Sequence, residues 1–171
     1  MQQHCIEPQG YYLATVHRPA NTDDVVTLRQ LLTALGQLEL PVVLPLHPRT
    51  RAVIEKHGIE TASNLQLIEP VGYLEMLALE QGARSVLTDS GGVTREAYFL
   101  SVPCVTLRTE TEWPETLVDG WNVLAGSDLD AIVQAARRPR PQTAPLPAFG
   151  DGRAATKIVE MLERDPPHSR R

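Results

Sequence analysis

Short apolar runs alternate with amphipathic stretches along this chain, and the alternation limits the folds open to it. Runs rich in β-branched or aromatic residues occur at residues 11–16, 42–46, 65–68, 85–88, 102–107 and 121–124. Apolar residues keep helical spacing at 25–38, 49–57, 73–81, 91–100, 113–118, 127–137 and 151–164. Strands that alternate with helices in this way predict an α/β fold with a parallel, doubly wound sheet.

The helix pattern at residues 25–38 is the clearest in the sequence. We expect Thr22 to cap this helix and Asp23 and Asp24 to lie in its first turn, where carboxylates interact favourably with the helix dipole. The segment 137–152 is too rich in proline to continue a helix, so we expect an extended connection to the last helix.

The length of 171 residues fits one α/β domain with a substantial core and is short for two domains. We expect a lead-in over residues 1–10, one domain over residues 11–163, and a flexible tail over residues 164–171. The two cysteines, Cys5 and Cys104, lie far apart and fit no metal-ligand spacing. We therefore expect reduced thiols and no bound metal.

The net charge of −5 gives the chain no general affinity for nucleic acid. A bound anion would therefore have to be held by local geometry. The first ten residues lack the apolar core of a signal peptide, and no stretch approaches the roughly 18 apolar residues of a membrane span. These features predict a cytoplasmic protein that binds neither membrane nor nucleic acid.

Polar residues follow each of the first five predicted strands. In chain order they include His17 and Arg18, His47, Pro70, the Asp-Ser-Gly-Gly stretch at 89–92, and then Arg108 and Glu115. The carboxyl ends of parallel strands share one edge of a sheet, and ligands bind at that edge in open α/β folds. Loops are polar in any protein, so part of this pattern is trivial. Histidines and arginines that converge on a Gly-Gly turn nevertheless suit an anion such as a nucleotide phosphate.

Ser90, Gly91 and Gly92 stand where the fourth strand leads into a helix. A helix start offers unpaired N–H groups and a positive dipole end, and glycines lacking Cβ atoms let an anion come close. Ser90 can cap the helix or donate its hydroxyl to the same phosphate. Glu96 lies one turn beyond Gly92, and because a carboxylate repels phosphate, its best partner is a neighbouring diol such as ribose.

Each of these features also has a purely structural explanation when taken alone. Ser-Gly-Gly can be a tight turn with Glu96 as a solvated helix residue, and a single histidine after a strand is commonly a loop or capping residue. The stretch TETEWPE can serve as a helix start, with proline at the first helical position and Trp113 as a packing residue.

Four motifs together resemble one known family. Residues 88–126, TDSGGVTREAYFLSVPCVTLRTETEWPETLVDGWNVLAG, closely resemble the nucleotide-binding half of UDP-N-acetylglucosamine 2-epimerases, where D-S-G-G-x-Q-x-E-A leads to P-x-x-x-x-R-x-x-T-E-x-P-E. ATVHRPANTDD, LPLHPRT and FGDGRAATKIVEML are similar to three further family motifs, in colinear order over residues 11–163. Ala20 and Thr94 depart from the pattern, which has glutamate and glutamine at these positions.

The resemblance implies the Rossmann-like, carboxyl-terminal nucleotide-binding domain of a GT-B fold, which takes UDP-N-acetylglucosamine or UDP and needs no cofactor. It assigns Ser90, Gly91 and Gly92 to the diphosphate, Glu96 to the ribose, and the backbone around Pro70 and Tyr73 to the uracil. It makes His17 a candidate catalytic residue near the diphosphate and sugar, with Glu115 and Arg108 at the sugar-phosphate site. Arg18 and His47 are further substrate-binding candidates because of their positions after the first two strands.

Enzymes of this family invert C2 of N-acetylglucosamine by eliminating UDP and adding it back, and a hydrolysing branch releases UDP. Family chains are about twice as long as this one, and the carboxylates thought to move the C2 proton belong to the amino-terminal domain. We therefore expect this chain to fold but not to epimerise alone, with an amino-terminal-domain chain or a second copy as partner. The alternatives are a non-catalytic nucleotide-sugar-binding module and the donor-binding half of a GT-B glycosyltransferase.

Overall fold

A six-stranded parallel sheet forms the centre of the molecule, in a computed structural model that describes residues 7–164. The strands are β1 (Tyr12–Thr15), β2 (Val42–Pro45), β3 (Leu65–Ile68), β4 (Ser85–Thr88), β5 (Cys104–Thr106) and β6 (Asn122–Leu124). Their order is β3-β2-β1-β4-β5-β6. The chain therefore adds β2 and β3 on one side of β1 and then β4, β5 and β6 on the other side, so the strand order reverses between β1 and β4. This is the order of a Rossmann-like doubly wound sheet, and the predicted fold class is confirmed.

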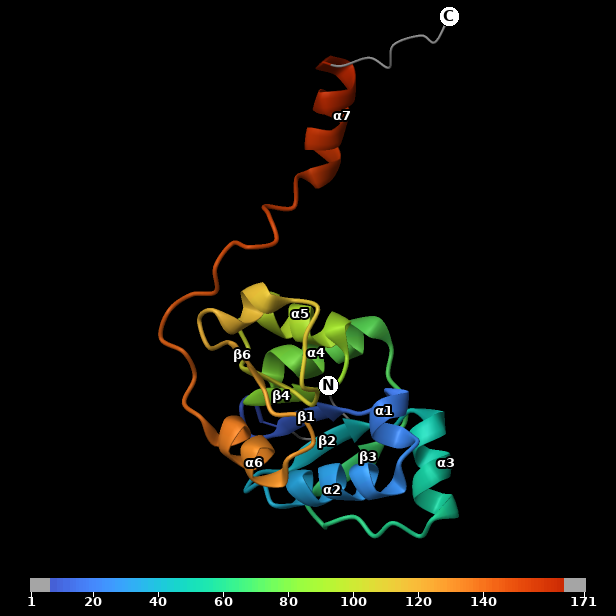
Figure 1. Cartoon of the computed structure of the whole chain (residues 1–171). Coiled ribbons are helices and arrows are strands. Elements are labelled where there is room, and N and C mark those ends of the chain that lie inside the picture. The colour runs from blue at the N-terminus through green and yellow to red at the C-terminus, as the bar shows by residue number, and fades with distance from the viewer. Residues whose placement is uncertain (1–6, 165–171) are drawn as a thin grey trace, which may run out of the picture.

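Helices cover both faces of the sheet (Figure 1). They are α1 (Pro19–Thr22), α2 (Val25–Gly36), α3 (Pro48–Lys56), α4 (Tyr73–Gly82), α5 (Gly91–Phe99), the 3-10 helix η1 (Pro114–Leu117), α6 (Leu129–Arg137) and α7 (Ala154–Arg164). Helices α2 and α6 lie on one face, and α4 and α5 lie on the other. This two-sided cover explains why every residue of β1, β4 and β5 is buried.

The core has two layers that meet at the sheet. In β1, Tyr12 and Ala14 point into the layer beneath α2 and α6, whereas Leu13 points into the layer beneath α4 and α5. All three side chains are fully buried. Alternate residues of a strand face opposite sides, so one four-residue strand contributes to both layers.

The predicted cap of α2 is wrong. Asp24, not Thr22, is the N-cap, and its carboxylate accepts the backbone N–H of Val26 at 3.1 Å. Thr22 instead ends the short helix α1, which begins at Pro19, and its hydroxyl donates to the carbonyl of Arg18 at 3.1 Å. Proline at the first helical position favours this extra turn, so α1 uses the residues that were expected to lead into α2.

Helix α7 stands away from the sheet and its covering helices (Figure 1). It has no buried residues, and Ile158 and Leu162 are 56% and 61% exposed. It begins at Ala154, later than the predicted residue 151, while the helix predicted at 113–118 is the shorter η1. Among residues 7–164, no helix combines the length and apolar character needed to cross a bilayer.

Two predictions concern parts of the chain outside the described residues. The lead-in is described only from residue 7, and the tail only at Arg164. Cys5 also falls outside the described residues, whereas Cys104 is a buried free thiol in β5. Burial raises the pKa of the Cys104 thiol to about 12, which makes it a poor nucleophile.

Candidate functional site

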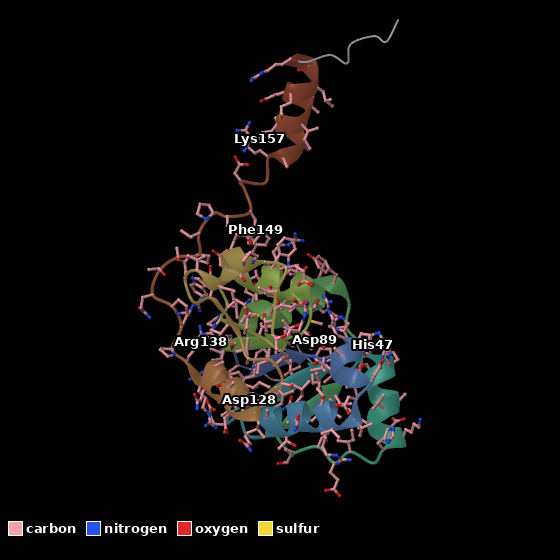
Figure 2. The ribbon with its side chains drawn as sticks, in the orientation of Figure 1. His47, Asp89, Asp128, Arg138, Phe149 and Lys157 are labelled. Carbon is pink, nitrogen blue, oxygen red and sulfur yellow. The ribbon has the colours of Figure 1, made fainter. Side chains whose placement is uncertain are left out.

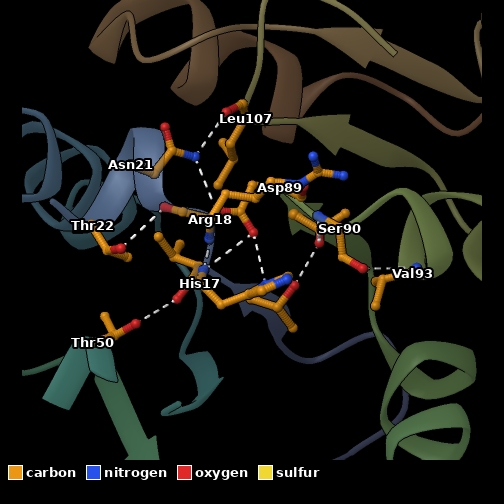
Figure 3. A network of polar contacts seen from close by, with 12 residues as sticks. His17, Arg18, Asn21, Thr22, Thr50, Asp89, Ser90, Val93 and Leu107 are labelled. Carbon is orange, nitrogen blue, oxygen red and sulfur yellow. Dashed lines mark hydrogen bonds and ion pairs between the residues drawn. The ribbon is translucent and has the colours of Figure 1, made fainter. Parts of the chain in front are cut away.

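Asp89, directly after β4, holds together the loops at the carboxyl edge of the sheet. The residue is only 1% exposed, and its carboxylate accepts the backbone N–H groups of His17 at 3.0 Å and Arg18 at 2.9 Å. The side-chain amide of Asn21 donates to the same carboxylate at 3.0 Å (Figure 3). Burial alone would raise the pKa of Asp89, but the hydrogen bonds from His17 and Arg18 outweigh it and hold the pKa below the ordinary value.

The His17 imidazole is oriented by the same carboxylate. Its Nδ1 lies 3.0 Å from Oδ1 of Asp89, and the His17 side chain is 42% exposed. The hydrogen bond with Asp89 raises the pKa of His17, although partial burial and the charge of Arg18 oppose the rise. With Nδ1 engaged by Asp89, Nε2 is the nitrogen left for a ligand.

His47 lies close to His17, as their positions after neighbouring strands predicted. The two ring centroids are 6.3 Å apart, and both side chains line a hollow with Pro70 and Met76. Nδ1 of His47 accepts the backbone N–H of Arg49 at 3.2 Å, so His47 also caps α3. Figure 2 labels His47 and Asp89, which follow the carboxyl ends of β2 and β4. Three predicted site residues, His17, His47 and Pro70, therefore share one hollow.

The start of α5 follows Asp89 immediately. Ser90 is its N-cap, as expected, and Oγ accepts the N–H of Val93 at 3.4 Å. A Cβ atom added at Gly92 would meet nothing closer than Ser90 Oγ at 3.7 Å, whereas one at Gly91 would lie 2.9 Å from Oε2 of Glu112. The absence of a side chain at Gly91 therefore lets a carboxylate approach the positive end of α5.

Glu112 is a site residue that the sequence did not predict. Its carboxylate is 3.1 Å from Nη2 of Arg18 and 2.8 Å from Nη1 of Arg108. The hydrogen bond from Arg108 is the main cause of its lowered pKa. Two arginines and the start of α5 thus surround a negative group, which is the environment that a phosphate requires. The position of Glu112 close to Arg108, in the loop after β5, was the available signal.

Tyr73 and Glu96 come together from different helices. The charge of Glu96 in α5 raises the pKa of Tyr73, the first residue of α4. Tyr73 is 64% exposed, so its ring and the half-buried Glu96 are both accessible to a ligand. Residues expected at the uracil and the ribose therefore lie side by side.

Glu115 lies on η1 and is exposed. Among residues 7–164 its side chain makes no hydrogen bond or ion pair with another predicted site residue. Its neighbour Trp113 fixes η1 to the start of α5, because Nε1 of Trp113 donates to the carbonyl of Gly91 at 2.8 Å. Trp113 also stacks under the guanidinium of Arg95, whose CZ is 4.5 Å from the ring centroid.

Comparison with known proteins points to one family. A family model described as UDP-N-acetylglucosamine 2-epimerase matches residues 1–163. A UDP-N-acetylglucosamine 2-epimerase homolog from Methanococcus maripaludis is 48% identical over 162 residues, which cover 92% of this chain. A UDP-2,3-diacetamido-2,3-dideoxy-D-glucuronate 2-epimerase from Pseudomonas aeruginosa is 48% identical over 160 residues, or 91% of this chain.

A solved structure gives the same result. The Methanocaldococcus jannaschii UDP-GlcNAc 2-epimerase in complex with UDP-GlcNAc and UDP superposes with a TM-score of 0.78, at 35% identity over 90% of this chain. The chain spans only about half the length of these proteins: the match covers 45% of each of the two relatives and 45% of the solved structure. The matched part is their carboxyl-terminal half.

Proposed function

This chain belongs to the UDP-N-acetylglucosamine 2-epimerase family, and from that premise we propose that residues 11–163 are the UDP-binding domain of such an epimerase. One observation supports the proposal most strongly. The positive start of α5, with Gly91 and Gly92, is flanked by the guanidinium groups of Arg18 and Arg108, which already hold a carboxylate there. A diphosphate would find the same donors in the same place.

The diphosphate is the leaving group of the proposed reaction, so its charge rises as the bond to C1 of the sugar breaks. Ser90 and the N–H groups of α5 stabilise that charge, as do Arg18 and Arg108. His17, held by Asp89 with a raised pKa, supplies a further hydrogen-bond donor from Nε2. In this proposal Glu115 takes part at the sugar only once substrate is bound.

The nucleoside extends from the α5 start toward α4. Glu96 lies one turn along α5 and accepts hydrogen bonds from the ribose hydroxyls, while the backbone around Pro70 and the ring of Tyr73 contact the uracil. The hollow beside Pro70, which His17 and His47 also line, gives the nucleotide a place at the sheet edge. The arrangement follows the rule that ligands of open α/β sheets bind where the strand order reverses.

The proton transfers at C2 need acid and base groups, which we assign to an amino-terminal domain that supplies the other half of the cleft. The chain covers 45% of its relatives, so a domain of comparable size accounts for the remainder. Helix α7 is the proposed contact with that domain, because Ile158 and Leu162 leave an apolar face exposed. A second copy of this chain is the alternative partner.

A second substrate also has specific support. The Pseudomonas relative named for UDP-2,3-diacetamido-2,3-dideoxy-D-glucuronate is as similar to this chain as the Methanococcus homolog, at 48% identity. The two substrates share UDP and differ in the sugar. The UDP contacts proposed above serve either one, and the amino-terminal domain would make the choice.

The test is an epimerase assay with both nucleotide sugars, using this chain alone and mixed with the amino-terminal half of a family member. We expect no turnover alone and measurable turnover after mixing. Ile158→Asp should reduce the restored activity, whereas Glu163→Gln, a change of an exposed charge on the same helix, should not. Turnover by the chain alone would refute the division of labour. UDP binding without turnover after mixing would favour a non-catalytic module, and sugar transfer to an acceptor would favour a glycosyltransferase.

A further inference from the structure

Trp113 is a partly buried residue beside the start of α5, and the proposed function gives it no part. Its indole Nε1 donates to the carbonyl of Gly91, the first residue of α5, at 2.8 Å. A Cβ atom added at Gly91 would lie 3.4 Å from the same nitrogen, so the indole reaches the open end of the helix. The sequence predicts only a packing role for Trp113, and this hydrogen bond indicates a second one.

The carbonyl of Gly91 and the N–H of Gly92 belong to one peptide unit. The unit is planar and trans, so the two groups point in opposite directions and turn together. The cap residue Ser90 accepts the N–H of Val93, and helix geometry leaves the N–H groups of Gly91 and Gly92 without a partner inside the helix. By holding the Gly91 carbonyl, Trp113 therefore also fixes the direction of a free donor at the helix start.

Two successive glycines make this helix start flexible unless another group holds it. Glycine has more backbone freedom to lose than any other residue and weakens a helix relative to alanine. A larger residue does not fit at Gly91, because its Cβ atom would lie 2.9 Å from Oε2 of Glu112. The hydrogen bond from Trp113 thus supplies, from outside the helix, an order that the local sequence does not provide.

A buried chain of hydrogen bonds fixes Trp113 itself. The hydroxyl of Thr106 in β5 donates to Oδ1 of Asn122 in β6 at 2.8 Å, and Nδ2 of Asn122 donates to Oγ1 of Thr116 at 3.0 Å. The Thr116 hydroxyl then donates to the carbonyl of Trp113 at 2.7 Å. The three polar residues are each at most 2% exposed. Trp113 is therefore tied through η1 to two strands of the sheet.

Two further side chains hold the indole ring. The guanidinium of Arg95 lies over its face, and the ring of Phe149 meets it edge to face, with centroids 5.6 Å apart and an interplanar angle of 84°. Phe149 lies on the connection between α6 and α7 (Figure 2). The backbone N–H of Leu146 binds this connection to the hydroxyl of Tyr98 at 2.8 Å. The connection thereby places Phe149 against Trp113.

We propose that Trp113 is a positioning residue for the diphosphate and that Phe149 holds it in place. Through the carbonyl of Gly91, Trp113 directs the N–H of Gly92 toward the anion. This inference rests on the proposed UDP site. It makes the proline-rich connection to α7 a support of that site, so a change at Phe149 should affect the diphosphate contacts and leave the uracil and ribose contacts unchanged.

The first test needs no nucleotide. Exchange of the Trp113 Nε1–H with water, followed by nitrogen-15 NMR, reports its hydrogen bond to Gly91 directly. The chain has two tryptophans, and the Trp113 signal is the one lost in Trp113→Phe. We expect slow exchange in wild type and exchange several-fold faster in Phe149→Leu, which keeps an apolar side chain and loses the ring.

Two variants serve as controls for Phe149→Leu. Phe149→Tyr keeps the ring, and Leu146→Ala changes a side chain that is 47% exposed on the same connection, so both should exchange as slowly as wild type. Exchange in wild type as fast as in a solvent-exposed tryptophan, or an equal rate in wild type and Phe149→Leu, would overturn the inference. Either result would leave the proposed UDP site intact.

The second test compares the affinities of UDP and uridine by NMR titration, which reaches millimolar dissociation constants. The ratio of the two affinities isolates the phosphates. Trp113→Phe keeps an aromatic ring and loses the donor, so the ratio should fall about three- to tenfold, as is typical of one lost hydrogen bond, at unchanged uridine affinity. Phe149→Leu should lower the ratio by a smaller factor. Phe149→Tyr, Leu146→Ala and Glu55→Gln, which removes an exposed carboxylate on α3, should match wild type.

The ratio separates positioning from a purely structural role. A structural role would lower the stability measured by urea unfolding and leave the ratio unchanged in variants that circular dichroism shows to be folded. An unchanged ratio in Trp113→Phe, or equal losses for UDP and uridine, would refute the role of Trp113 alone. Phe149→Leu decides in the same way if Trp113→Phe does not fold. Failure of the wild-type chain to bind UDP would refute the proposed function together with this inference.

Discussion

Replacing Asp89 with asparagine is expected to lower the pKa of His17 below its ordinary value of 6.5. In the wild-type protein the hydrogen bond and the charge of Asp89 raise this pKa, against partial burial and the charge of Arg18. Asparagine removes the charge and leaves at most a weaker, uncharged acceptor for the His17 ring, while both of the lowering effects remain. His17 should then be neutral at pH 7, and its hold on a diphosphate should weaken.

The same substitution should destabilise the fold. Asp89 is buried and accepts N–H groups from His17, Arg18 and Asn21, and removing one partner of such a buried network costs about 3–5 kcal/mol. Asparagine keeps the shape and one acceptor oxygen, so we expect about 3 kcal/mol. The size of this destabilisation should depend on pH.

The pH window follows from the two pKa shifts. The pKa of Asp89 is lowered, so its contribution to stability is present above 3.8 and is lost as the pH falls through its folded value. The pKa of His17 is raised, so its contribution is present below 6.5 and is lost as the pH rises through its folded value. The difference in free energy of unfolding between wild type and Asp89→Asn should therefore be largest at about pH 4 to 6.5.

Proton NMR of the His17 ring, assigned with His17→Gln, measures the pKa, and urea unfolding at pH 5.5 and 8.5 measures the stability. Asp23→Asn is the matched control, because Asp23 is 55% exposed and its ion pair with Arg49 lies at the surface. We expect the control to change stability by less than about 0.5 kcal/mol. A His17 pKa that is the same in wild type and Asp89→Asn would refute the account of this network.

Three further substitutions test other parts of the structure. Leu87→Ala, in the fully buried strand β4, should lower the free energy of unfolding by about 2–5 kcal/mol in a denaturant titration. Glu80, on α4, is fully buried, and burial is the main cause that raises its pKa to about 8. Above pH 4.5 the unfolded chain loses the Glu80 proton more readily than the folded chain, so Glu80→Gln should gain stability relative to wild type as the pH rises from 5 toward 8.5, by up to about 4 kcal/mol. Unchanged relative stability across this range would contradict the raised pKa of Glu80. Glu112→Gln should strengthen UDP binding several-fold at low salt in calorimetry, because Arg18 and Arg108 lose a competing carboxylate, and weaker binding would show that Glu112 itself assists the ligand.

The sheet could be predicted because each strand is recognisable from its local sequence. Residues 12–15, for example, form a short, mostly apolar run with an aromatic residue, and helices separate this run from the next strand, which leaves a parallel sheet as the simplest arrangement. The start of α2 could not be placed, since Thr22 and Asp24 are both good cap residues. The choice between them depends on α1, a single turn that starts at Pro19.

The site was predicted where it depends on strand order and missed where it depends on side-chain packing. His17 and His47 meet because β1 and β2 are neighbours, and Ser90 caps α5 as the local sequence indicates. Glu80 is the opposite case: it is fully buried while Leu74 on the same helix is 78% exposed. A hydrophobic pattern predicts the reverse for both residues, because it cannot foresee which side of α4 packs against α5.

Cytoplasmic location, the domain bounds at residues 11 and 163, and the roles of the individual site residues stay predictions. The central claim is that this chain binds UDP through the start of α5 and through Glu96. Calorimetric titration of UDP into the purified chain at pH 7 tests it most directly, with Glu96→Gln and Ser90→Ala beside wild type and Glu55→Gln as control. We predict saturable binding at one site, weakened about tenfold or more by Glu96→Gln, clearly weakened by Ser90→Ala, and unchanged in the control. Absence of UDP binding, or equal affinity in all four proteins, would contradict the claim.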